Sequence, residues 1–354
     1  MQKDSKIFIA GHSGLVGSAL VRRLAEKGFN NLLVHDLSSL NLTRQNDVEN
    51  FFRKDKPEYV FLAAARVGGI IANNTYKADF IYDNLAIATN VIHSAYEFGV
   101  KKLLNLGSSC IYPKLAPQPL KEEYLLSDYL EATNEPYAIA KIAAIKLCRY
   151  FNEQYGTNFI SLMPTNLYGR NDNFNLETAH VLPALIRKFY LAKLLMEQNY
   201  ELVFKDIQRY KLGFGYDNQV VSGNIQNIIM ILEKIGIKSD SVLSWGTGSP
   251  YREFLHVDDL ADAAIYLMEK FEYKDIGEFV NVGAGKDQTI SEIAAMIKDI
   301  VGFKGRIAYD ISKPDGTPRK LLDVSRLSKL GWQPKISLEE GIRKSFQWYV
   351  AQGQ

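Results

Sequence analysis

The segment from Lys102 to Lys141 holds a serine, a tyrosine and a lysine that could together transfer a proton. Its opening apolar run leads to Ser108, and Tyr137 and Lys141 follow four residues apart. On a helix, residues i and i+4 lie on one face, so the ammonium would lie beside the phenol. A neighbouring cation favours the phenolate, so we expect the pKa of Tyr137 to fall from about 10 towards neutrality. Such a tyrosine can exchange a proton at physiological pH, while Ser108 could hold the oxygen that receives it.

A glycine-rich turn near the N-terminus predicts a dinucleotide site to go with this chemistry. A short apolar run, 6–10, precedes glycines spaced G-x-x-G-x-x-G, and an amphipathic pattern follows them. The first glycine permits the tight turn, the second lets the backbone approach a pyrophosphate, and the third allows close helix–strand packing. The pyrophosphate would lie at the helix N-terminus, where unpaired N–H groups point outward. The expected contacts are Gly11, Ser13, Gly14, Leu15, Val16 and Gly17.

Asp36 ends the predicted second strand and bears on the choice of cofactor. An acid about 20 residues after the glycines typically hydrogen-bonds the ribose hydroxyls of NAD and repels the 2′-phosphate of NADP. A helix-capping or solvated aspartate is the alternative.

Strands alternate with helices along the first half of the chain. We expect strands at 6–10, 32–36, 59–65, 102–106 and 159–163, and helices after the glycine turn and at 46–54, 79–98 and 137–155. Later we expect strands at 241–245 and 278–283, helices at 290–301 and 338–349, and a basic loop at 313–320. Continuous apolar strands between helices indicate an α/β fold, here a Rossmann-type doubly wound parallel sheet with a smaller C-terminal α/β substrate-binding domain.

Composition is that of a soluble globular enzyme. Of 354 residues, 47% are hydrophobic and 23% charged, and the net charge of +2 gives no footprint for nucleic acid or a membrane surface. The two cysteines, Cys110 and Cys148, are too few for a disulfide framework and lack zinc-ligand spacing, so no metal is expected. No apolar run is long enough for a signal peptide or a bilayer span, which favours a cytoplasmic location.

Longer segments resemble a known family, the GDP-L-fucose synthases of the extended short-chain dehydrogenase/reductase class. The matching segments are GLVGSAL, VGGIIANNTYKADFIYDN, LGSSCIYPKLAPQP, NEPYAIAKIAAIKLC, PTNLYG, REFLHVDD and KPDGTPRKLLDV. The similarity covers nearly the whole chain. It implies an NADP(H)-dependent 3,5-epimerase/4-reductase that acts on a GDP-4-keto-6-deoxy sugar.

The resemblance also implies residue roles. Ser108, Tyr137 and Lys141 would reduce the C4 ketone, and Cys110 and His180 would exchange protons at C3 and C5. This is chemically sensible, because a 4-keto group acidifies those protons and thiols and imidazoles titrate near neutrality. The alternatives are a small buried cysteine and a hydrogen-bonded histidine. The other histidines (His12, His35, His93 and His256) are read as structural.

Further contacts follow from the same resemblance. For the cofactor they are Ala63, Leu106, Gly107, Tyr137, Lys141, Pro164, Asn166, Leu167 and His180. For the substrate they are Ser109, Asn166, Lys188, Trp245, Arg252 and Asp315. Arg252 suits a pyrophosphate through bidentate hydrogen bonds, while Lys320 is either a further contact or a solvated side chain.

The chain departs from the family pattern in three places. Ser13 and Asp36-Leu37 stand where basic residues commonly recognise the 2′-phosphate; we expect NADP(H), with Arg44 or Arg66 substituting, and NAD(H) as the alternative. Lys188 stands where the family has an arginine, so a compact ammonium charge replaces a planar guanidinium that can form two parallel hydrogen bonds. Residues 196–240 form an apparent insertion, either a tolerated surface loop or a segment that reshapes the sugar pocket or an oligomer interface.

These observations predict domains and leave alternatives open. Residues 1–170, with returning segments near 220–260, would form the NAD(P)-binding domain, and 171–354 mostly the substrate-binding domain. A homodimer would form through the helices at 79–98 and 137–155. The alternatives are a C4 reductase acting on a GDP-4-keto-heptose without epimerisation, an NAD-dependent nucleotide-sugar 4-epimerase, and a non-enzymatic NAD(P)-sensing protein.

Overall fold

Six parallel strands form the large sheet in the computed structural model, which describes residues 1–313 and 315–352. The strands run in the order β2-β1-β3-β4-β5-β9. Their bounds are β1 Ile7–Ala10, β2 Leu32–Leu33, β3 Tyr59–Leu62, β4 Lys102–Leu106, β5 Phe159–Pro164 and β9 Val280–Val282. The chain passes from β1 to β2 on one side and returns to β3 on the other. Ligands bind at such a reversal, outside the carboxyl ends of the strands. The predicted doubly wound α/β fold is confirmed.

Helices cover both faces of this sheet because successive strand residues point to opposite faces. Ile7 and Ile9 pack in the core shared with α1 and α9. Phe8 and Ala10 pack in the core shared with α2, α4 and α5. The helix bounds are α1 Leu15–Glu26, α2 Gln45–Asp55, α4 Lys77–Glu97, α5 Glu135–Tyr155 and α9 Val257–Lys270.

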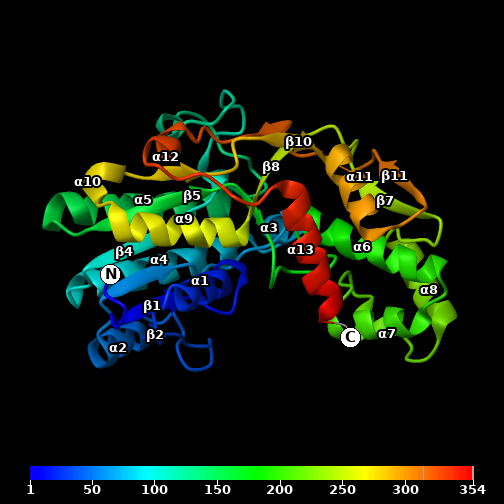
Figure 1. Ribbon diagram of the computed structural model, residues 1–354, viewed down its shortest axis with the longest axis horizontal. Coiled ribbons are helices and arrows are strands. Elements are labelled where there is room, and N and C mark those ends of the chain that lie inside the picture. Colours follow the sequence, from blue (N-terminus) through cyan, green and yellow to red (C-terminus); the bar gives the residue numbers. More distant parts are fainter. Residues whose placement is uncertain (314, 353–354) are drawn as a thin grey trace.

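A second core lies at the other end of the molecule, around α6, α7, α8, α11 and the parallel pair β7 and β11. Helix α13 lies between this part and the large sheet (Figure 1). The bounds are α6 Val181–Met196, α7 Tyr200–Arg209, α8 Ile225–Lys234, β7 Ser241–Trp245, α11 Ile290–Val301, β11 Arg306–Asp310 and α13 Leu338–Ala351.

A smaller sheet connects the two parts. Strand β8 pairs with β10 in antiparallel fashion and with β6 and β12 in parallel. The bounds are β6 Asn166–Tyr168, β8 Tyr251–His256, β10 Asp287–Thr289 and β12 Arg319–Lys320, and the short helices are α3 Ile70–Thr75, α10 Tyr273–Ile276 and α12 Ser325–Lys329. Because β6 follows β5 directly and β8 follows β7, residues from both parts meet at this sheet.

The structure differs from the sequence-based expectation in three places. Strand β2 ends at Leu33 and pairs only with β1, so the residues up to Asp36 leave the sheet. The segment 196–240 forms α7 and α8, whose apolar stripes are buried in the second core. The chain therefore rejoins the core of the large sheet only at the end of the predicted range 220–260, with Leu255, Val257 and Leu260, and continues there with α9 and β9. Pro314 of the predicted basic loop lies outside the described residues, among which no helix has the length and apolarity needed to span a bilayer.

Candidate active site

A cleft of about 1770 Å³ opens at the carboxyl ends of β1, β3, β4 and β5 and extends over the second part of the molecule. Pockets for single small ligands are commonly about 300–1,000 Å³, so this cleft has room for two ligands side by side. Its lining includes residues from the glycine turn, from the ends of β4 and β5, and from α6, β7 and β8.

The glycine turn is packed so closely that side chains would not fit. A Cβ on Gly11 would lie 2.7 Å from Ala64 Cα, and one on Gly17 would lie 2.0 Å from the Gly11 carbonyl oxygen. Gly11 also has a φ of +83°, which favours glycine. Gly14 precedes α1 with no side-chain cap, so the first N–H groups of the helix are available to an anion. The turn fits a dinucleotide pyrophosphate.

Apart from Arg44, Asp36 is the one predicted site residue that does not line the cleft. Its side chain is 74% exposed, and its carboxylate lies 3.5 Å from Nε2 of His12. Arg66 does line the cleft, but it pairs with Asp79 and Asp83 at 3.1 and 2.7 Å. The acid that would repel a 2′-phosphate is therefore exposed and is not part of the cleft lining.

Ser108, Tyr137 and Lys141 meet beyond the end of β4. Ser108 begins a single 3₁₀ turn, and its Oγ accepts a hydrogen bond from the Cys110 N–H at 3.4 Å. Helix α5 begins at Glu135 with a proline in its first turn, which places Tyr137 and Lys141 one turn apart. Lys141 donates from Nζ to the Leu106 carbonyl at 2.8 Å.

The pKa of Tyr137 moves opposite to the sequence-based expectation. Burial raises the pKa of Tyr137, with a nearby Cys110 adding to the rise and a hydrogen bond with Ser108 opposing it. Lys141 lies 5.7 Å from the centroid of the ring, and burial lowers the pKa of this lysine to about 8. The lysine thus lies beside the ring face and bonds to a carbonyl, so Tyr137 is a neutral phenol that can donate a proton.

Cys110 and His180 line the same cleft, and Lys320 influences both. Burial raises the pKa of the Cys110 thiol, while the positive charges of Lys320 and Lys141 oppose the rise. His180 precedes α6, and its enclosure lowers the pKa of the imidazole, with Lys320 adding to the effect. A thiol and a neutral imidazole therefore line the same cleft as Tyr137.

Cations surround the end of the cleft formed by the second part. Arg252 donates to the carbonyls of Tyr251 and Asp315 at 2.7 and 3.4 Å and forms no ion pair among the described residues. Lys188 donates to the Leu243 carbonyl at 3.0 Å, and burial lowers its pKa to about 8. The Asp315 carboxylate accepts from the N–H and hydroxyl of Thr247. This region suits the phosphates of a nucleotide.

Comparisons with known proteins identify the family. A family model described as NAD dependent epimerase/dehydratase family matches residues 7–212 and 207–283. GDP-L-fucose synthase 1 of Arabidopsis thaliana is 53% identical over 348 residues, which cover 98% of this chain and 94% of that protein. The chain belongs to the GDP-L-fucose synthase family.

Solved structures resemble this GDP-L-fucose synthase family member over the full chain. A GDP-6-OMe-4-keto-L-xylo-heptose reductase from C. jejuni is 45% identical, with a TM-score of 0.92 and 99% coverage of both chains. MlghC, a GDP-mannoheptose C4 reductase from Campylobacter jejuni with NADP bound, is 44% identical, with a TM-score of 0.85 and the same coverage.

In this family member the cleft is also lined by residues that the motifs in the sequence do not single out. Lys320 lines the cleft close to Cys110, and Phe214 and Tyr216 enter it from the segment between α7 and α8. The sequence Gly-Phe-Gly-Tyr is a turn pattern that presents aromatic side chains, and it was the available signal for the latter two. Of the histidines read as structural, His256 accepts from the Asp258 N–H and caps α9, whereas His35 lines the cleft.

Proposed function

We propose that this protein reduces the C4 ketone of a GDP-4-keto sugar with NADPH and also exchanges the protons at C3 and C5, as a step in nucleotide-sugar biosynthesis. One observation carries the proposal. Ser108, Tyr137 and Lys141 face a single cleft that the glycine turn borders at one end and Arg252 at the other.

The residues divide the reduction between them. Ser108 would donate a hydrogen bond to the ketone oxygen and orient it towards the phenol of Tyr137. Tyr137 would then give its proton to that oxygen as negative charge develops there, and Lys141 stabilises the phenolate left behind. NADPH supplies the hydride when bound. Ketone, hydride and proton balance to the alcohol.

Cys110 and His180 support the epimerisation half of the proposal. Inversion at a carbon beside the ketone requires one group to remove a proton and another to return one from the opposite face. A thiol and a neutral imidazole that line the same cleft can fill these roles.

NADPH is proposed over NADH on two grounds. Asp36 is exposed and does not line the cleft, so its charge would be less able to repel a 2′-phosphate held there. A solved relative that is 44% identical is described with NADP bound. We further propose that the large sheet and its helices hold this cofactor, while the part around α6 holds the GDP-linked sugar. A water-soluble substrate of this kind supports a cytoplasmic location.

A second candidate function is C4 reduction of a GDP-4-keto-heptose without epimerisation. Two solved structures that align with this protein over 99% of both chains are named as GDP-heptose reductases, and this favours the second candidate. Incubating the enzyme in D₂O with GDP-4-keto hexoses and heptoses, followed by NMR of the products, separates the two. Deuterium at C3 or C5 supports the bifunctional enzyme, and reduction without deuterium supports the second candidate.

Tyr137→Phe tests the reductase assignment. The variant lacks the donated proton, so NADPH oxidation with a GDP-4-keto sugar should fall about 100-fold or more. The melting temperature and NADPH affinity should remain those of the wild type. Wild-type turnover in a folded variant would rule out the proposed mechanism.

A further inference from the structure

We infer that the loop 212–217, between α7 and α8, is a specificity-determining wall that holds the planar base of the nucleotide sugar against the rings of Phe214 and Trp245. The inference rests on the proposed function, because it assigns the base of the same GDP-linked substrate. It gives the segment 196–240 a role in substrate recognition.

The two aromatic rings border one region of the cleft. Phe214 and Trp245 both line it, with ring centroids 6.3 Å apart and planes inclined at 58°. Trp245 is 44% exposed, a high value for a tryptophan at the end of a strand, so part of its ring is free to contact a ligand. Aromatic side chains with free faces are the groups on which bases stack.

The loop has an unusual backbone that points to a functional constraint. Gly213, Phe214 and Gly215 have φ values of +80°, +54° and +72°. For the glycines this is ordinary, but a phenylalanine in the left-handed region is strained and persists only where its surroundings hold it. The Glu177 carboxylate accepts from the Phe214 N–H at 2.7 Å. Asp217 accepts from the backbone N–H groups at the start of the loop.

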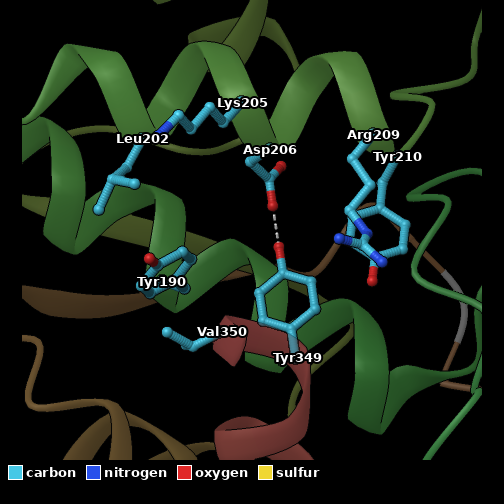
Figure 2. Close-up of a pocket in the computed structure, with 8 residues that line it drawn as sticks. All are labelled: Tyr190, Leu202, Lys205, Asp206, Arg209, Tyr210, Tyr349 and Val350. Atoms are coloured by element: carbon cyan, nitrogen blue, oxygen red, sulfur yellow. Dashed lines mark hydrogen bonds between the residues drawn. The ribbon is translucent and has the colours of Figure 1, made fainter. Parts of the chain in front are cut away.

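The helix before the loop is anchored by a buried polar cluster. Asp206 of α7 accepts from the fully buried Arg187 at 2.9 Å. Figure 2 shows that the same carboxylate accepts from the hydroxyl of Tyr349 on α13. Arg187 also donates to the carbonyls of Tyr210 and Lys211, immediately before the loop, at 2.8 and 2.7 Å. The loop is therefore presented by a fixed support.

The charges around the two rings suit the rest of a nucleoside diphosphate. Lys313 lies 5.6 Å from the centre of the Trp245 ring. Arg252 and Lys188 line the same cleft, and the carboxylates of Asp315 and Glu177, which also line it, are occupied by protein hydrogen bonds. A base against these rings would thus share the cleft with cations that can bind its phosphates.

Calorimetric titration of the full-length protein with GDP tests the inference. Phe214→Ala should weaken GDP binding about 5- to 100-fold, the usual range for loss of one stacking ring. Phe214→Tyr keeps a ring and should bind GDP like the wild type, whereas Phe214→Leu keeps the apolar bulk and should bind weakly. NADPH affinity should be unchanged in all three variants.

Two controls make the result specific. Met230→Ala removes an exposed side chain of α8 that does not line the cleft, and it should leave GDP binding unchanged. Inorganic pyrophosphate lacks a base, so Phe214→Ala should bind it as the wild type does. A folded Phe214→Ala or Phe214→Leu variant with wild-type GDP affinity would contradict the assignment of this loop to base recognition. A wild-type protein that fails to bind GDP would contradict both the proposed function and the role of the loop in base recognition.

Discussion

Around Cys110, two effects act in opposite directions on one thiol. Burial raises its pKa, and the positive charges of Lys320 and Lys141 lower it. Tyr137 also lies close, because Cys110 contributes to the raised pKa of the phenol. Cys110 can remove a proton from a sugar carbon only as the thiolate, so the balance at this thiol sets the pH at which exchange through Cys110 begins.

Lys320→Met should therefore slow deuterium exchange at C3 and C5 and move its pH profile to higher pH. Without the lysine charge the thiol pKa rises, and a higher pH is needed to form the same fraction of thiolate. The measurement is deuterium incorporation from D₂O, followed by NMR at several pH values and at saturating substrate. An unshifted profile would show that Lys320 does not act on the thiol.

Sequence reasoning succeeded at the residue scale where chemistry depends on local spacing. Tyr137 and Lys141 are one helical turn apart, and a helix was sufficient to bring them together. It failed for the pKa of Tyr137, since burial by distant segments and the bond of Lys141 to the Leu106 carbonyl are not visible in a local pattern. Asp36 was placed in the cleft for a similar reason: β2 ends before it.

Among the elements, the glycine turn depends most on the absence of side chains. Gly17→Ala should abolish measurable NADPH binding, because its Cβ would lie 2.0 Å from a backbone oxygen and the turn would have to open. Fluorescence titration with NADPH measures the effect. Gly14→Ala is the steric control, since the nearest atom to its Cβ is 3.6 Å away, and it should fold normally. NADPH affinity retained in Gly17→Ala would contradict this account of the turn.

Lys102 secures the C-terminal end of α9 to the large sheet. It is buried, and its Nζ donates to the carbonyls of Leu267, Met268 and Phe271. Lys102→Met leaves these carbonyls without that donor, so the free energy of unfolding at pH 7 should fall by about 1–3 kcal/mol. Urea denaturation measures the change.

The same variant should show a pH dependence of known sign. Burial lowers the pKa of Lys102 from 10.5 to about 8. Between these values the unfolded chain holds more protons than the folded one, so the wild type gains stability as pH rises through this window. The methionine variant lacks that gain, and its deficit should widen between pH 8 and pH 10. A deficit that stays constant would contradict the lowered pKa.

Most helices and strands of the large sheet were predictable because each is a clear apolar run or stripe. Helices α7 and α8 were not predictable, since the short apolar stripes there alternate with lysines and amides. The stripes can be assigned to helices only when the second core against which they pack is known. Their caps were nevertheless in the sequence: Asn199 and Asn224 each accept from a backbone N–H of the helix that follows.

For the whole molecule, we propose a homodimer through α4 and α5, which pack side by side and carry exposed aromatic residues. Tyr82 and Tyr150 are 63% and 53% exposed. Sedimentation should give the mass of a dimer for the wild type and of a monomer for the double variant Tyr82→Asp/Tyr150→Asp. Tyr129→Asp, outside these helices and 88% exposed, should remain dimeric. A dimeric double variant would place the interface elsewhere.

The bond between Arg187 and Asp206 limits how this chain can be shortened. Excising 196–240 to make a more compact enzyme would remove the carboxylate and leave a guanidinium enclosed in an apolar core, a change that costs about 3–5 kcal/mol when one partner of such a pair is lost. A trimmed protein would need an apolar side chain at position 187 as well. Engineering of the segment should therefore treat Arg187 and the excised helices as one unit.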